Sequence, residues 1–178
     1  MILVGIGSNL SSPAGPPPQT VQAAVQAMAR HGIAVRARSS LWHTPPYPRS
    51  AQPWFTNAVV AVATPLGPHD LLHKLHEIER QFGRKRRIKW AARPLDLDLL
   101  DYNRQVLGAG ALGVDHLKRP LMLPHPAVES RNFVLKPLAE VAPRWTHPVT
   151  GQGIAHLISQ LPKSHLGSQS IRKGAHFC

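Results

Sequence analysis

The sequence predicts a mixed α/β fold, in which two amphipathic helices cover one face of a four-stranded antiparallel sheet and further helices are added at the C-terminal end. Three observations support this prediction: short apolar runs typical of strands, two segments with apolar residues at helical spacing, and the order in which these segments follow each other. The chain has 178 residues, which suits one compact domain. We expect residues 1–162 to form this domain and residues 163–178 to form a basic C-terminal tail.

The first half of the chain contains three predicted strands and one predicted helix. Residues 1–6 are an apolar run, residues 33–44 alternate in part between apolar and polar side chains, and residues 54–64 are rich in strand-forming side chains. Residues 20–30 place apolar side chains at helical spacing. A proline-rich loop is predicted over residues 11–18, because proline removes a backbone donor and fixes φ.

The second half begins with an amphipathic helix over residues 67–83, in which apolar side chains recur at i, i+4, i+7 and i+11 from Leu71. A basic loop then leads into a strand over residues 93–101. The order so far is β-α-β-β-α-β, which is the ferredoxin-like arrangement. Three more segments follow in the prediction: an edge strand at 104–108, a helix at 130–141 and a short helix at 154–161.

Cysteine content and hydropathy predict a cytoplasmic, soluble protein. The single cysteine, Cys178, is the last residue, so no internal disulfide can form and a reducing compartment is favoured. The amino terminus lacks a basic leader and a cleavage-like site. No run approaches the roughly 18 apolar residues that a membrane span requires.

The charge of the chain is strongly positive and unevenly distributed. Its 21 Lys and Arg against 9 Asp and Glu give a formal charge of +12, which favours a polyanionic partner: a nucleic acid, a nucleotide or an acidic membrane surface. Six of the 21 basic residues lie at positions 84–93, and three of the 9 acids lie at positions 96–101. Opposite charges are therefore adjacent along the chain, which is typical of a site that holds phosphate through both cations and metal ions.

Asp96 and Asp98 alternate with three leucines in the predicted strand at 93–101. Residues i and i+2 share one face of a strand, with α-carbons roughly 6.5 Å apart, so the two carboxylates point the same way and repel each other unless a cation intervenes. Two magnesium ions about 3.5 to 4 Å apart would fit between them and a polyphosphate. The alternative is a solvated strand face with the acids paired to arginines. Asp101 falls on the leucine side of the alternation, and we assign it no metal.

The common phosphate-binding loops are absent from the sequence. The segment "GIGSNL" has Leu10 where a third glycine would complete a dinucleotide-binding motif, and no P-loop motif occurs. A P-loop kinase or a Rossmann enzyme is therefore disfavoured. A magnesium-dependent nucleotidyltransferase remains the alternative, because Gly7-Ser8 with a later Asp-x-Asp is typical of that class.

With these motifs in order, the chain resembles the 6-hydroxymethyl-7,8-dihydropterin pyrophosphokinase family of folate biosynthesis. The matching segments are "GIGSNL" at 5–10, "TPP" at 44–46, "FTNAV" at 55–59, "KWAARPLDLDLL" at 89–100, "LPHP" at 123–126 and "RNFVLKPLAEVAP" at 131–143. Such enzymes have a ferredoxin-like core, act mostly as monomers, and transfer the terminal diphosphate of ATP to the pterin hydroxymethyl group, releasing AMP. The resemblance therefore implies ATP and the pterin as substrates, with no nucleic acid or membrane as partner.

The resemblance also implies roles for individual residues. Asp96 and Asp98 would hold two magnesium ions, and the catalytic group would be completed by Arg84, Arg86 and Arg93. ATP would be bound by Glu79, Lys89, Trp90, Leu99, His125 and Arg131. The pterin would be bound by Thr44, Pro45, Pro46, Tyr47, Phe55, Asn57 and Phe133, with the two phenylalanines on either face of the ring and Asn57 reading its amide edge.

Two departures and one rival function bear on this reading. Phe55 stands where the family often has tyrosine, and Pro126 follows His125 where a tyrosine is common, so the adenine contacts are the least defined. Taken alone, Phe55 and Phe133 would be interpreted as core residues. An RNA-recognition module shares the topology, but it needs an aromatic strand motif that this chain lacks, with aromatics at 6%.

Overall fold

The computed structural model describes residues 1–46, 50–84, 91–108 and 121–161, and the backbone of residues 172–173. The described part contains a mixed α/β sheet structure in which every strand pair is antiparallel. The elements in chain order are β1 (Ile2–Ser8), α1 (Pro17–Arg30), β2 (Ala34–Arg38), β3 (Trp42–Thr44), β4 (Phe55–Ala63), α2 (Pro68–Gln81), β5 (Asp96–Tyr102), the 3-10 turn η1 (Val128–Ser130), α3 (Asn132–Val141), α4 (Ile154–Gln160) and β6 (Arg172–Lys173).

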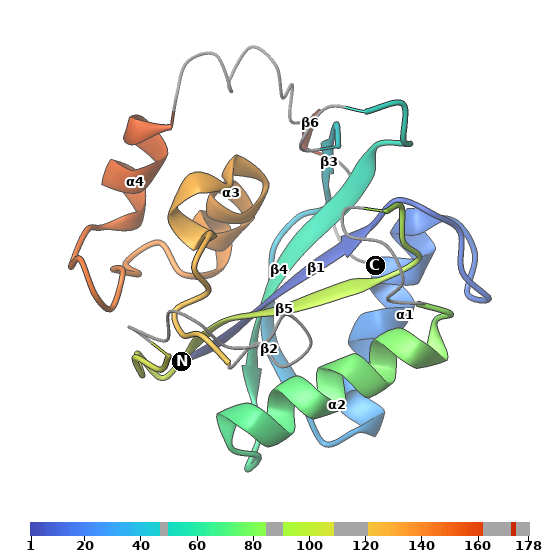
Figure 1. Cartoon of the computed structure of the whole chain (residues 1–178), viewed down its shortest axis with the longest axis horizontal. Coiled ribbons are helices and arrows are strands. Elements are labelled where there is room, and N and C mark those ends of the chain that lie inside the picture. The colour runs from blue at the N-terminus through green and yellow to red at the C-terminus, as the bar shows by residue number, and fades with distance from the viewer. Residues whose placement is uncertain (47–49, 85–90, 109–120, 162–171, 174–178) are drawn as a thin grey trace.

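The strand order confirms the ferredoxin-like prediction. The sheet runs β5-β1-β4-β3-β6, and β2 also pairs with β4, so the first strand of each βαβ unit is central and its partner strand is outer. Helices α1 and α2 lie together on one side of the sheet, and α3 and α4 lie on the other (Figure 1). The added C-terminal helices therefore cover a sheet face that the ferredoxin-like core alone would leave open.

The predicted strand at 33–44 is divided into β2 and β3, which both pair with β4. The break lies at Ser39, whose side-chain oxygen accepts the Val59 N–H at 3.0 Å in place of a backbone carbonyl. The next residue turns away from the sheet, because the Ser40 N–H donates to Glu140 Oε2 at 2.6 Å. A serine side chain thus interrupts the ladder without leaving the Val59 donor unpaired.

Prolines and glycines define the two helices of the core. Each helix begins with proline at its first position, Pro17 in α1 and Pro68 in α2, where the missing N–H is not needed. Gly32 and Gly83 follow the two helix ends with φ of 74° and 85°, a conformation that favours glycine. The predicted proline loop at 11–18 therefore ends earlier than expected, since its last two prolines open α1.

Strands β1 and β5 are paired so that Asp96 lies opposite Gly7 and Asp98 lies opposite Gly5. The register then shifts between Leu3 and Val4, and Asp101 lies opposite Leu3. Asp101 consequently points to the side of α3 and α4, where it accepts the indole N–H of Trp145 at 2.7 Å. The expectation that Asp101 lies on the leucine side was wrong, because the bulge reverses the alternation.

Two further segments differ from the prediction. The predicted edge strand at 104–108 is a turn with one isolated bridge, Leu107 to Leu123. Residues 172–173, which lie in the predicted tail, pair with β3. No helix within the described ranges is long and apolar enough to cross a membrane.

Candidate active site

A cavity of about 330 Å³ lies on the α3 side of the sheet, over the end of β1 that carries Gly5 and Gly7. Its walls come from β3, β4, β5 and the segment at 125–134, together with Arg84 shortly after α2 and Arg93 shortly before β5. Most of the predicted site residues that are described line this one cavity: Thr44, Pro45, Phe55, Asn57, Arg84, Arg93, Asp96, Asp98, His125, Arg131 and Phe133.

Glycine forms the floor of the cavity. An added Cβ at Gly7 would lie 3.1 Å from Asn57 Oδ1 and 3.8 Å from the Asp96 Cβ, so a larger residue would press on the polar side chains around it. The apolar run predicted at 1–6 contains Gly5 and ends before Gly7, and the sequence-based prediction gave neither glycine a role in shaping the site. Glycine inside a strand pattern is itself the signal, because it often marks a place where a ligand approaches the backbone.

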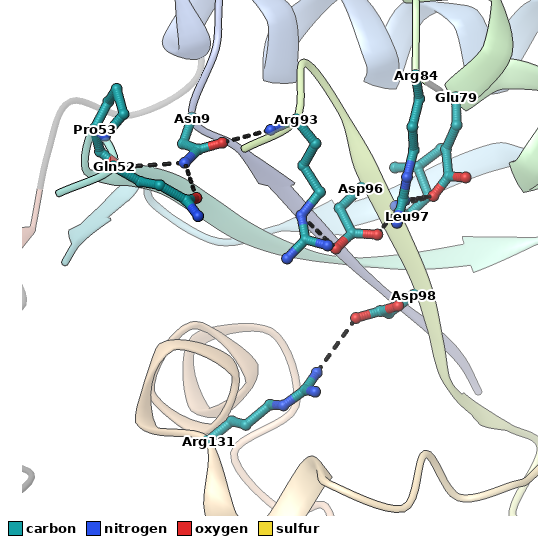
Figure 2. A network of polar contacts seen from close by, with 10 residues as sticks. All are labelled: Asn9, Gln52, Pro53, Glu79, Arg84, Arg93, Asp96, Leu97, Asp98 and Arg131. Atoms are coloured by element: carbon teal, nitrogen blue, oxygen red, sulfur yellow. Dashed lines mark hydrogen bonds and ion pairs between the residues drawn. The ribbon is translucent and has the colours of Figure 1, made fainter. Parts of the chain in front are cut away.

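Asp96 and Asp98 lie on the same face of β5 and both point into the cavity, as the alternation predicts (Figure 2). Asp96 is bound on both oxygens: Arg84 Nη1 donates to Oδ1, and Arg93 Nε lies 3.2 Å from Oδ2. Asp98 has a looser partner, Arg131 Nη1 at 3.5 Å. Three arginines from three different segments therefore surround the two carboxylates.

The electrostatics of Asp98 favour a proton or another cation beside it. Burial and the neighbouring charge of Asp96 raise the pKa of the Asp98 carboxyl to about 7, and Arg131 offsets part of this rise. Asp98 is therefore partly protonated near neutral pH when nothing else is bound. A carboxyl group with this property gains from any divalent cation that enters the cavity.

Glu79 lies behind the cavity, with 1% of its surface exposed. Its Oε1 accepts the Leu97 N–H at 2.8 Å and a hydrogen bond from Arg84 Nη1 (Figure 2). Burial acts to lower the pKa of the Arg84 guanidinium, but the charges of Asp96 and Glu79 outweigh burial and raise it. The prediction that Glu79 faces a nucleotide does not fit this burial; the side chain instead holds Arg84 and the β5 backbone.

Two aromatic rings and one amide line the same cavity. Phe55 lies at the start of β4 with the Arg93 Cζ 5.6 Å from its ring centroid, and Phe133 lies in α3 with the Arg131 Cζ 5.7 Å away. Asn57 Nδ2 donates to Thr44 Oγ1 at 2.8 Å, which fixes the amide on the cavity wall. Each aromatic ring thus lies close to one of the arginines that contact Asp96 or Asp98.

His125 lies beside the carboxylates as a neutral imidazole. Burial and the positive charge of Arg131 lower its pKa to about 4. Its Nδ1 accepts the Ala127 N–H at 3.2 Å, so the proton of the neutral ring is on Nε2. At neutral pH this side chain can donate a hydrogen bond to a bound anion without adding charge.

The remaining predicted site residues are placed elsewhere or lie outside the described residues. Pro46 and Leu99 are buried and do not line the cavity, and Leu99 packs in the core under α1 and α2. Four predicted residues fall outside the described ranges: Tyr47, Arg86, Lys89 and Trp90. The cavity wall also includes Ala127, Ser130 and Val134, which were not among the predicted site residues.

Comparisons with known proteins decide the family. Residues 3–143 match the family model described as 7,8-dihydro-6-hydroxymethylpterin-pyrophosphokinase (HPPK). The chain belongs to this family. It is 37% identical over 161 residues to the 2-amino-4-hydroxy-6-hydroxymethyldihydropteridine pyrophosphokinase of Methylorubrum extorquens, covering 90% of this chain and 93% of that protein. It is 38% identical over 160 residues to the Synechocystis protein of the same name, covering 89% and 75%.

The fold of this chain is similar to that of a solved structure. The Plasmodium falciparum HPPK-DHPS crystal structure matches with a TM-score of 0.70 at 14% identity, covering 93% of this chain and 44% of that one. This chain therefore corresponds to less than half of the Plasmodium protein. The resemblance inferred from the motifs is confirmed.

The two carboxylates fit the magnesium ions that the motif resemblance implies. They share one cavity, Asp98 has a raised pKa, and cationic arginines already lie against them. Within the described ranges no cluster of three or more His, Cys, Asp and Glu side chains is found. This donor set suits Mg²⁺, which commonly takes one or two carboxylates and completes its shell with waters and phosphate oxygens.

Proposed function

We propose that this HPPK-family protein transfers the terminal diphosphate of ATP to the hydroxymethyl group of 6-hydroxymethyl-7,8-dihydropterin, releasing AMP, in folate biosynthesis. The observation that carries the proposal is the meeting of two chemistries in one cavity. Asp96 and Asp98 with their arginines form a group suited to a polyphosphate, and Phe55, Asn57 and Phe133 form a group suited to a flat heterocycle. The family relatives are named for this activity.

The carboxylates and arginines would act by neutralising charge. Asp96 and Asp98 would hold two magnesium ions, which would supply charge compensation for the phosphates. Arg84, Arg93 and Arg131 would contact phosphoryl oxygens, since a guanidinium offers two parallel donors to such groups. Arg84 and Arg93 would exchange their contacts with Asp96 for contacts with phosphate when ATP enters, and both guanidinium groups would then lie beside the transferred group.

The two aromatic rings and the Asn57 amide would orient the nucleophile. Phe55 and Phe133 offer apolar faces for the planar ring, and the Asn57 amide, held by Thr44, offers a fixed polar edge. The hydroxymethyl oxygen would then attack the β-phosphorus in line, and the bond between that phosphorus and the AMP oxygen would break. Most of the catalysis would come from positioning and from the arginines that face the developing charge.

We further propose that the protein acts as a monomer in the cytoplasm, with no nucleic-acid or membrane partner. The single cysteine at the last position supports a reducing compartment. The positive charge is accounted for in part by the arginines that line the cavity. Size-exclusion chromatography with light scattering would test the monomer, and a mass of twice 19.5 kDa would overturn it.

The decisive experiment identifies the products of a reaction with ATP, Mg²⁺ and 6-hydroxymethyl-7,8-dihydropterin. AMP and the pterin diphosphate are the expected products, detected by mass spectrometry and by ³¹P NMR. Release of pyrophosphate with an AMP-linked pterin would instead indicate a nucleotidyltransferase, which attacks the α-phosphorus. A chelator control without free Mg²⁺ should abolish the reaction.

A further inference from the structure

Asn9 lies directly after β1, between the segment that carries Arg93 and the segment that carries Gln52 and Pro53 (Figure 2). Asn9 is 2% exposed, and both the oxygen and the nitrogen of its side-chain amide form hydrogen bonds. Oδ1 accepts the Arg93 backbone N–H at 2.8 Å, while Nδ2 donates to Gln52 Oε1 and to the Pro53 carbonyl, each at 3.2 Å. A buried amide with partners at both ends is held in one orientation and holds its partners in turn.

The backbone of the same loop binds the other side of Arg93. The N–H groups of Asn9 and Leu10 donate to the Arg93 carbonyl at 3.1 and 3.2 Å. Both backbone hydrogen-bonding groups of Arg93 are therefore bound to the loop after β1. Pro94 follows, and a residue that precedes proline is confined to extended conformations. The direction in which the Arg93 side chain leaves the backbone is consequently fixed.

The Arg93 side chain lies close to both Asp96 and Phe55. Its Nε lies 3.2 Å from Asp96 Oδ2, and its Cζ lies 5.6 Å from the Phe55 ring centroid. Phe55 comes two residues after Pro53, which is the other segment that Asn9 binds. The Asn9 amide thus bridges the segment that leads to Phe55 and the segment that carries Arg93.

We propose that Asn9 is a positioning residue that sets the place of Arg93 between Asp96 and Phe55. It does not line the cavity, so it acts on the transfer step through Arg93 and touches neither substrate. The inference rests on the proposed function, in which Arg93 binds phosphate. A long side chain amplifies a small backbone movement, and a displacement of 1 Å at a reacting centre can lower a rate by roughly a hundredfold.

A double-mutant cycle tests whether Asn9 acts through Arg93. We expect Asn9→Ala to lower kcat by roughly ten- to a hundredfold while KM for ATP and for the pterin changes little. In an Arg93→Ala background, the same change should lower kcat by less than about twofold, because its target has been removed. Unchanged kcat in Asn9→Ala, or effects that multiply in the double variant, would overturn the inference.

Two matched variants separate positioning from folding. Asn9→Asp keeps the acceptor for the Arg93 N–H and loses both donors, so it should retain more kcat than Asn9→Ala; an equal or greater loss would contradict the role of that acceptor. Asn103→Ala removes a surface amide at φ of 50° that accepts from the Met1 ammonium group, and it should lower the thermal midpoint with kcat unchanged.

The wild-type reaction makes the two hypotheses distinguishable. A wild-type protein that forms no AMP contradicts the proposed function itself. An active wild type whose Asn9 variants keep full kcat contradicts the inference alone. If Asn9→Ala does not fold, Asn9→Asp carries the same cycle with Arg93→Ala, and multiplicative effects there have the same meaning.

Discussion

The two faces of the central sheet are built from alternate residues of the same strands, yet one is a closed core and the other holds the cavity. On the α1 and α2 face, Ile6 and Leu97 are at most 2% exposed. On the other face, Gly7 and Asp96 lie opposite each other and border open space. A shift of one residue along a strand therefore separates core from site, and the period of two lets one strand serve both.

The cavity occupies only part of its face. Toward the other end of the strands, Leu3 and Leu100 pack against α3 and α4 and close the layer. The difference between the two halves is side-chain volume in β1, since leucine fills what glycine leaves open. The comparison teaches that the site depends on what the strand omits as much as on the carboxylates that it carries.

The largest expected effect comes from removing charge on the open face. Asp98→Asn keeps the size of the side chain and removes the carboxylate, so we expect kcat to fall on the order of 10³-fold, with the fold intact. Steady-state kinetics and circular dichroism would measure the two effects. Retention of near-normal turnover would remove Asp98 from the proposed site.

The next effect comes from the adjacent residue on the closed face. Leu97 is 1% exposed, and Leu97→Ala should lower the free energy of unfolding by about 2–5 kcal/mol through lost burial and a residual cavity. Turnover per folded molecule should stay close to wild type. Urea denaturation gives the stability change, and a large loss of kcat without destabilisation would mean that the faces are not independent.

A smaller effect is expected from filling the floor of the cavity. Gly7→Ala adds a methyl group 3.1 Å from Asn57 Oδ1, so the amide must move by a few tenths of an ångström, and the KM for the pterin should rise more than the KM for ATP. Gly153→Ala is the matched control, because nothing lies within 4 Å of an added Cβ there. Equal changes in both KM values would argue against a pterin contact at Asn57.

Much of this division was predictable from the sequence, because a period of two is visible in the letters. The alternation at 93–101 placed Asp96 and Asp98 together, and the apolar periodicity from Leu71 predicted α2. The bulge that redirects Asp101 was not predictable, since Leu99 and Leu100 are both apolar and either could face the core. The strand break at Ser39 likewise depends on a tertiary contact with Glu140.

Site residues that belong to a recognisable motif were predictable from the sequence. Buried residues that hold those residues in place were less so. Glu79 shares the apolar side of α2 because it accepts the Leu97 N–H, and no spacing in the sequence indicates that partner. Asn9 was missed for the same reason, although an asparagine directly after a strand is a common place for side-chain to backbone bonds. Buried polar residues of this kind need the structure.

The smallest expected effect is a pH dependence of stability, to which two cavity-lining groups, Asp98 and His125, contribute with opposite signs. The raised pKa of Asp98 makes the folded protein bind more protons than the unfolded chain between pH 3.8 and about 7, so this group lowers stability as pH rises through that window. The lowered pKa of His125 has the opposite sign: its neutral folded form lowers stability as pH falls from 6.5 to about 4.

Single variants should separate the two slopes. In Asp98→Asn the His125 slope remains, so the thermal midpoint should rise more steeply with pH between about 4 and 6.5 than in wild type. In His125→Gln the Asp98 slope remains, and the midpoint should rise less or fall over the same window. Scanning calorimetry without added metal gives both curves. Parallel curves for the two variants would mean that neither group titrates differently in the folded and unfolded states, and that the cavity solvates its polar side chains as fully as water does.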